Sequence, residues 1–141
     1  MFLAIHGLRL FPGADLRTAL ITLPREQNFE AGFILSAVGS LCRVRLRFAG
    51  AETVWEREAD FEILTLSGTL GPDGPHLHMS VADAAGAVTG GHVLEGCVVR
   101  TTAEIVVGLA PGWSFRRALD PATGYLELRA ETHGDEKHNG G

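Results

Sequence analysis

Three histidines that lie close together in the sequence have the spacing most suggestive of chemistry. His76 and His78 are two residues apart, so on a β-strand their side chains project from the same face. His92 follows a turn predicted at Asp83–Gly86, which places it on the adjacent strand of a hairpin. Zinc enzymes often hold their metal with three imidazoles and keep a fourth position open for water. The sequence therefore predicts a divalent-metal site at His76, His78 and His92, with zinc as the commonest occupant.

The register of that hairpin decides whether the three histidines converge. A plain two-residue loop at Ala84–Ala85 pairs His92 with Leu77 and turns its ring away from the other two. A shift of one residue instead places His92 opposite His78. A β-bulge at Gly90–Gly91 would supply that shift with the least strain, because glycine accepts positive φ. Both registers stay open, and convergence requires the shifted one.

Two carboxylates inside apolar strand segments are candidate catalytic residues. Glu62 lies in the segment Phe61–Leu64, and Glu104 lies within Ala103–Val107. A buried carboxylate must be paired, protonated or bound to a metal, so either residue could act as a general base or could orient a metal-bound imidazole. The alternative is a structural pair with Arg100, or a side chain that faces outward from a half-exposed sheet.

A basic stripe is predicted on another strand. Arg43, Arg45 and Arg47 alternate with apolar residues, so the three guanidinium groups point the same way and could contact nucleic-acid phosphates. Acidic residues on the following segment could instead neutralise the stripe by cross-strand pairing, namely Glu52, Glu56 and Glu58.

Composition and charge restrict the class of protein. The chain has 141 residues, of which 45% are hydrophobic and 21% charged, as expected for one globular domain with a substantial core. The net charge is -5, from 12 basic and 17 acidic residues. Proteins that bind DNA avidly without sequence preference are usually basic, so the composition disfavours that function for this chain alone.

The sequence lacks the motifs of several other classes. The two cysteines, Cys42 and Cys97, form no CxxC pattern, which disfavours a disulfide framework or a cysteine-rich zinc site and favours a reducing, cytoplasmic location. The first residues do not resemble a signal peptide, and no apolar run is long enough to span a membrane, so no membrane partner is expected. Motifs of P-loop NTPases, Rossmann dehydrogenases and nucleophile-elbow serine hydrolases are also absent.

The hydrophobic pattern predicts one helix among many strands. A helix should begin near Asp15, bury Leu16, Ala19, Leu20 and Leu23 on one stripe, and end, kink or restart near Leu23 because Pro24 follows. Strands are expected at residues 2–10, 33–38, 43–48, 61–70, 77–82, 87–94, 98–109, 113–119 and 125–129. These elements indicate an α+β domain with a mainly antiparallel sheet over residues 1–130. Residues 131–141 are predicted to form a disordered C-terminal tail.

An ordered set of motifs resembles the PPC domain, the plants-and-prokaryotes conserved domain, of the stand-alone bacterial type. The matching segments are Arg9–Gly13 with Asp15–Leu16, Leu35–Leu41, Phe61–Gly68, His76–His78, Gly90–His92 and Glu95–Glu104. The resemblance implies an antiparallel sheet with one principal helix packed against it, assembled as a homotrimer. In land plants this domain follows AT-hook motifs in nuclear DNA-binding proteins, and prokaryotic members are often labelled DNA-binding by that association. This chain has no Arg-Gly-Arg-Pro hook.

Two functions are consistent with these observations. The first is a homotrimeric, DNA-associated regulatory or interaction module with a histidine-based metal site, whose direct contact with DNA is weak. The second is a small metal-dependent enzyme, in which a metal held by the three histidines activates water and Glu62 or Glu104 accepts the proton.

Overall fold

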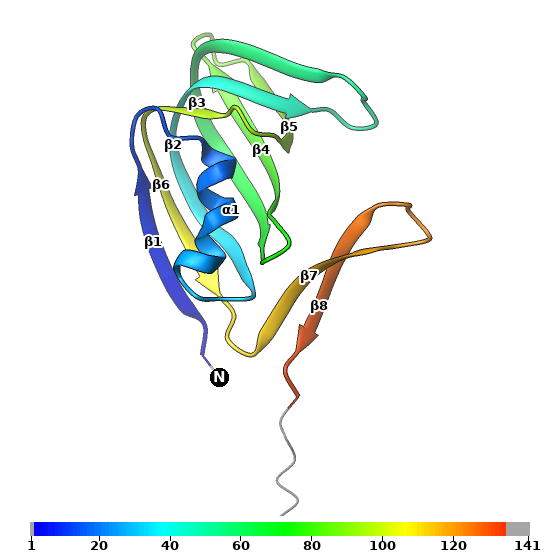
Figure 1. The fold of residues 1–141 in the computed structure, drawn as a ribbon. Helices are drawn as coiled ribbons and strands as arrows, with labels where there is room; N and C mark the ends of the chain where they lie inside the picture. The colour runs from blue at the N-terminus through cyan, green and yellow to red at the C-terminus, as the bar shows by residue number, and fades with distance from the viewer. Residues whose placement is uncertain (1, 135–141) are drawn as a thin grey trace, which may run out of the picture.

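The computed structural model describes residues 2–134 and consists of one helix and eight strands (Figure 1). In chain order these are β1 (Ala4–Leu10), α1 (Leu16–Glu26), β2 (Gly32–Arg47), β3 (Val54–Leu70), β4 (His76–Asp83), β5 (Val88–Val93), β6 (Val98–Leu109), β7 (Trp113–Leu119) and β8 (Leu126–Thr132).

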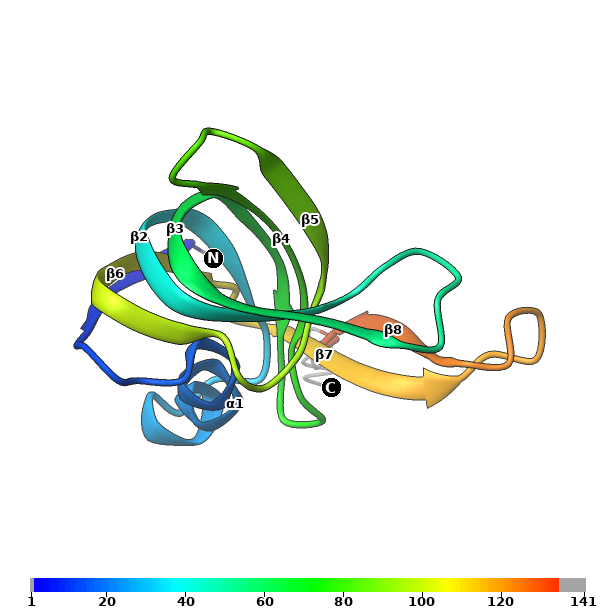
Figure 2. The same ribbon diagram turned by 90° about the horizontal axis from the view of Figure 1, so that it is seen from above.

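Six of the strands form one sheet in the order β1-β6-β2-β3-β4-β5, and every neighbouring pair is antiparallel. The end of β2 also pairs with β5 through Leu46–Val93 and Arg47–His92. This second contact curls β2 to β5 into a barrel-like unit, as the view from above shows (Figure 2). The predicted α+β class with a mainly antiparallel sheet is confirmed.

The helix covers the inner, concave face of the sheet. Its apolar stripe is buried at Leu16, Leu20 and Leu23, where it joins the core that the inward-facing residues of the strands form. Asp15 is the N-cap, and its carboxylate accepts hydrogen bonds from the backbone N–H groups of Thr18, at 3.0 Å, and Gly96, at 2.6 Å. One side chain therefore begins the helix and ties it to the segment that leads into β6.

The helix does not end at Leu23 but continues through Pro24 to Glu26. A proline removes one hydrogen-bond donor, so the carbonyl of Leu20 receives no bond from position 24, and the helix ends two residues after the proline. The N–H of Gln27 still donates to the carbonyl of Leu23 at 2.9 Å, and the N–H of Phe29 donates to the carbonyl of Pro24 at 3.0 Å. The last turn thus closes around the proline.

The predicted strands at 33–38 and 43–48 are parts of one long strand, β2. It lies in the interior of the sheet, and its register against its neighbours shifts between Leu41 and Arg43. After this irregularity the strict alternation expected from the sequence is present. Val44 and Leu46 are fully buried, whereas Arg43, Arg45 and Arg47 project from the outer face.

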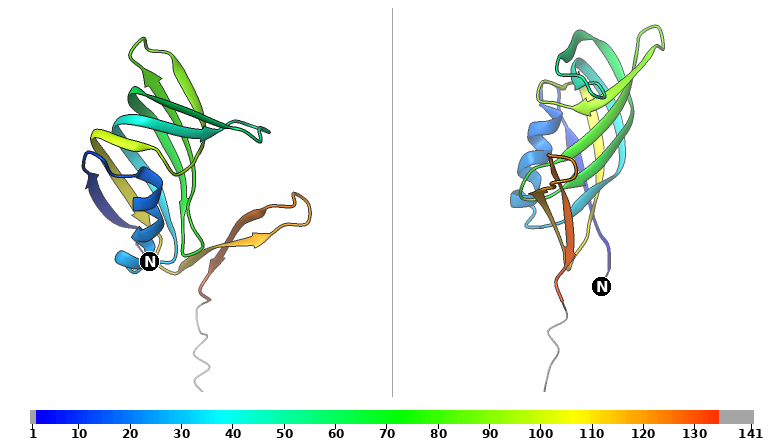
Figure 3. Two further views of the ribbon diagram at one scale, coloured as in Figure 1. Left: turned by 45° about the horizontal axis from the view of Figure 1, so that its top comes forward. Right: turned by 90° about the vertical axis from the view of Figure 1, so that its right-hand side faces the viewer.

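The last two strands form a separate hairpin that projects from the main sheet (Figure 3). β8 runs to Thr132, so the first two residues of the predicted tail belong to a strand, and residues 135–141 lie outside the described part. Cys42 and Cys97 are both free thiols. Among residues 2–134, no helix is long and apolar enough to cross a membrane.

Candidate metal centre

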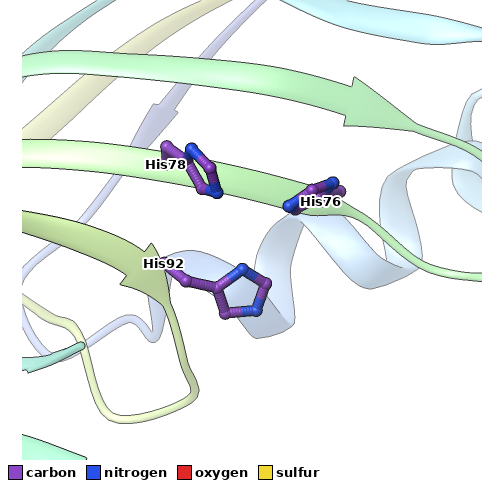
Figure 4. A group of neighbouring side chains, drawn as sticks. All are labelled: His76, His78 and His92. Carbon is purple, nitrogen blue, oxygen red and sulfur yellow. The ribbon is translucent and has the colours of Figure 1, made fainter. Parts of the chain in front are cut away.

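The three histidines converge on one patch of the outer surface (Figure 4). His76 and His78 project from β4 and His92 from β5, on the face opposite the buried Leu77 and Val93. The ring centroids lie 4.9 Å apart for His76 and His78, 5.2 Å for His76 and His92, and 5.8 Å for His78 and His92. Of the two hairpin registers that the sequence left open, the structure therefore has the one that brings the three histidines together.

The turn of the hairpin supplies the register shift. Asp83 pairs with Ala87, its N–H donating to the Ala87 carbonyl at 2.9 Å, so the loop has three residues rather than two. The carboxylate of Asp83 accepts hydrogen bonds from the N–H groups of Ala85, at 2.9 Å, and Ala87, at 3.0 Å. Gly86 completes the turn with a φ of 79°, a conformation that glycine adopts without strain. From there the register runs unbroken to the pair His78–His92.

The predicted bulge at Gly90–Gly91 is therefore wrong, because both glycines lie in regular register with β4. Gly91 has a different role. A Cβ added at this position would lie 2.7 Å from the backbone oxygen of Arg47, closer than real side chains come. Glycine is thus needed here because β2 and β5 approach closely where the sheet curls on itself.

The surroundings favour the neutral form of two of the histidines. Burial, reinforced by the nearby positive charge of Arg47, lowers the pKa of His92 to about 4. Burial and the charge of Arg117 also lower the pKa of His76 below its ordinary value. A neutral imidazole keeps the lone pair that a metal requires, so both rings are in the ligand form at neutral pH.

The donor set fits a divalent transition metal. One potential ligand nitrogen from each ring lies within 4.8 Å of the others. In a tetrahedral zinc site two ligand nitrogens lie about 3.4 Å apart, since each bond is about 2.1 Å long. Rotation of the imidazole rings about their side-chain bonds is therefore needed to bring all three nitrogens to one ion. The three residues can therefore hold one metal, and three protein ligands leave a position for another group.

A shallow pocket of about 210 Å³ adjoins the histidines. His76 and His78 form part of its lining, together with Ser67, Gly68 and Thr69 of β3 and with Arg117, Glu127 and Leu128 of the β7–β8 hairpin. The sequence analysis missed Arg117 and Glu127. Nothing in the local pattern marks them, because only the docking of the hairpin beside β3 and β4 brings them to the pocket.

The structure places Glu62 and Glu104 away from the histidines. Both carboxylates are exposed on the outer face of the sheet, where Glu62 is opposite Ser40 and Ala82, and Glu104 is opposite Arg9 and Val38. The cluster of potential metal ligands contains neither of them. Both side chains therefore face outward from the sheet, which was the alternative to a catalytic role. A catalytic role for either residue stays a prediction.

Most of the basic stripe is paired within the chain. Arg43 and Arg45 both form ion pairs with Glu56, the latter at 3.1 Å between Arg45 Nε and Glu56 Oε2. The hydrogen bond from Arg43 and the two positive charges lower the pKa of Glu56. Arg47 lies beside His92 in the β2–β5 pairing. Two of the three predicted phosphate contacts are therefore engaged by a carboxylate, as the cross-strand alternative anticipated.

The order of these elements and the histidine spacing agree with one protein family. The model of the Plants and Prokaryotes Conserved (PCC) domain matches residues 2–111. The chain belongs to the PCC family. This is the family that the ordered motifs resemble, and the matched region includes all three histidines but ends before the β7–β8 hairpin.

Three known proteins similar to this PCC chain differ in length and description. The bifunctional protein GlmU of Synechococcus sp. (strain JA-2-3B'a(2-13)) is 54% identical over 132 residues, which are 92% of this chain and 20% of GlmU. The chain thus spans about a fifth of that curated relative.

Two solved structures match nearly end to end. A hypothetical protein from Salmonella enterica is 37% identical, with a TM-score of 0.90 over 93% of this chain and 95% of that one. A metal-containing protein from Archaeoglobus fulgidus is 28% identical, with a TM-score of 0.74 over 89% of this chain and 93% of that one.

Proposed function

We propose that this PCC domain binds one divalent metal, zinc being the commonest candidate, through His76, His78 and His92 and uses the centre to act on a small ligand. The observation that carries this proposal is the convergence of three imidazoles from two strands beside a pocket. The 28% identical archaeal relative, itself a metal-containing protein, supports it. A bound metal of this kind supplies a Lewis acid that polarises an oxygen atom.

The chain's own residues would hold and surround that centre. The turn at Asp83–Gly86 keeps His78 and His92 opposite each other before any ligand arrives. The open pocket gives a ligand access from the side of β3 and the β7–β8 hairpin. Glu127, which lines this pocket, is better placed than Glu62 or Glu104 to take up a proton there.

A DNA-associated role has less support in this chain. The net charge is -5, and Glu56 engages Arg43 and Arg45. The only support for a regulatory, DNA-associated function is the resemblance to the family. We therefore keep that function as the second proposal, with any direct DNA contact centred on Arg47.

We also infer that the chain assembles as a homotrimer in the cytoplasm. The sheet has several exposed apolar side chains, among them Ile5, Val38 and Leu64, which are 67%, 60% and 50% exposed. β1 is an edge strand with one side unpaired among the described strands. Both features favour association with other copies. Light scattering at micromolar concentration should give three times the mass of one chain, and a monomer mass would contradict the inference.

Metal analysis of protein purified without a histidine tag tests the metal site. We expect close to one metal ion per chain in the wild type and a strong loss of bound metal in His78→Ala. His133→Ala is the matched control, because His133 lies outside the cluster and contacts Glu30 at 3.0 Å. Equal metal content in wild type and His78→Ala would refute the proposed ligand set.

A further inference from the structure

We propose that Arg117 binds the anionic group, a carboxylate or a phosphate, of a small ligand in the pocket beside the histidines. This inference rests on the proposed metal site, because the ligand would lie between Arg117 and the metal. It assigns a binding role to the β7–β8 hairpin, which lies beyond the residues that the family model matches.

The first observation is that Arg117 has no carboxylate partner. Its Nη2 donates a hydrogen bond to Thr69 Oγ1 at 2.8 Å, but no acidic side chain of residues 2–134 lies within ion-pair distance of it. Six other arginines of the described chain do form ion pairs, among them the adjacent Arg116, which contacts Glu30 at 3.3 Å. The charges of Glu127 and Asp73 lie near enough to oppose the lowering of the pKa of Arg117 by burial, but neither forms an ion pair with it. A half-buried guanidinium without an ion-pair partner is suited to an external anion.

The second observation is that the guanidinium is already positioned. The hydrogen bond to Thr69 fixes it against β3, and the backbone N–H of Arg117 donates to Asp73 Oδ2 at 3.0 Å, which fixes this part of the hairpin. Burial lowers the pKa of Arg117, which reflects a charge partly removed from water. The remaining N–H groups can bind two oxygens of one carboxylate or phosphate.

The third observation is the charge distribution around the pocket. Arg47 lies beside His92 without an ion-pair partner in the described residues, so two arginines that form no ion pair, Arg47 and Arg117, lie near the histidines. A divalent metal would add to this positive field, which Glu127 on the wall of the pocket and Asp73 beside Arg117 oppose. An anionic ligand is therefore favoured near Arg117, and a hydrogen-bond donor of the same ligand would be favoured near Glu127.

The size of the pocket limits the ligand. Its volume of about 210 Å³ is smaller than the roughly 300–1,000 Å³ that is typical of sites for drug-sized molecules. The ligand, or the part of it that enters, must be small and carry its negative charge close to the group that meets the metal.

Two simple anions test the proposal on zinc-loaded protein. Acetate and inorganic phosphate are titrated separately while amide chemical shifts are followed by NMR, so the two arms distinguish a carboxylate site from a phosphate site. We expect saturable shifts at Thr69 and Arg117 with at least one of the anions. Arg117→Gln should weaken that binding at least tenfold. Arg116→Gln removes the same charge one residue away and should leave the affinity within twofold.

The results separate this proposal from the metal site. Zinc binding, measured first by calorimetry, should be nearly unchanged in Arg117→Gln. If the wild type binds no zinc, the metal site is refuted, and the same anion titrations on the metal-free protein then decide the role of Arg117. Anion binding by zinc-loaded protein that is equal in Arg117→Gln and wild type would overturn the role of Arg117. If that variant fails to fold, the wild-type shifts decide: no saturable change at Thr69 or Arg117 with either anion refutes the proposal.

Discussion

His78 lies directly across the β4–β5 hairpin from His92, and a three-residue loop rather than a bulge places it there. The side chain of Asp83 holds two N–H groups of that loop, and Gly86 occupies its left-handed position. The convergence of the three histidines thus depends on a turn that contributes none of them.

Removing one residue between this loop and His92 should abolish metal binding. Deletion of Thr89 leaves the loop unchanged but shifts the rest of β5 by one residue against β4, which would pair His92 with Met79 and turn its ring to the opposite face. We expect zinc affinity, measured by calorimetry, to fall at least a hundredfold. Substitution of Thr89 by Ser keeps the length of β5 and should retain wild-type affinity. Unchanged zinc affinity after the deletion would show that the register of this hairpin does not decide metal binding.

Gly86→Ala should destabilise the domain because φ is 79° at this position. A Cβ in the left-handed region costs about 1–2 kcal/mol, which urea unfolding can resolve. Gly7→Ala is the matched control, since Gly7 has ordinary φ and open space around its Cα. The prediction fails if both variants unfold at the same urea concentration.

The metal-free protein should lose stability as the pH falls from about 6.5 to about 4. The pKa of His92 is about 4 in the folded chain, below the ordinary value of 6.5. Between these values the unfolded chain binds a proton that the folded chain does not, so acid favours unfolding. Above pH 6.5 this histidine has no such effect. Urea midpoints measured across the range should fall more steeply for wild type than for His92→Gln, and equal slopes would contradict the assignment.

Duplex DNA should bind weakly to the wild-type chain at physiological salt. The chain carries a net charge of -5, and the ion pairs of Glu56 occupy Arg43 and Arg45. Glu56→Gln releases both guanidinium groups, so it should raise the affinity at low salt and steepen the salt dependence. Fluorescence anisotropy with a labelled duplex measures both quantities. Sub-micromolar wild-type binding that survives competitor DNA would be incompatible with this expectation.

Local patterns predicted much of the fold and the identity of the histidines. The alternation around Val44 and Leu46 indicates a strand with one buried face, and the spacing of Leu16, Leu20 and Leu23 indicates the helix. These features depend on residues close in sequence. The His76–His78 spacing likewise places two rings on one face in any strand.

What could not be predicted depends on contacts between distant segments. A bulge and a longer loop shift the register equally, and the hydrogen bonds of Asp83 decide between them only in the folded turn. The glycine at position 91 looked like a bulge signal, yet it accommodates the backbone of Arg47. Arg117 lines the pocket beside His76 and His78 only because the hairpin docks beside β3.

Because β2 pairs with β3, β5 and β6, the main sheet cannot be separated into two parts that fold independently. Neither half of the chain can complete the backbone hydrogen bonds of β2 alone, because β3 precedes the histidine hairpin and β6 follows it. Partial opening from either end would leave this strand exposed along one side, so the barrel-like unit should melt as a single cooperative block. The amide protons of β2 should then exchange with solvent only when the whole domain unfolds, whereas those of the projecting β7–β8 hairpin exchange through local opening.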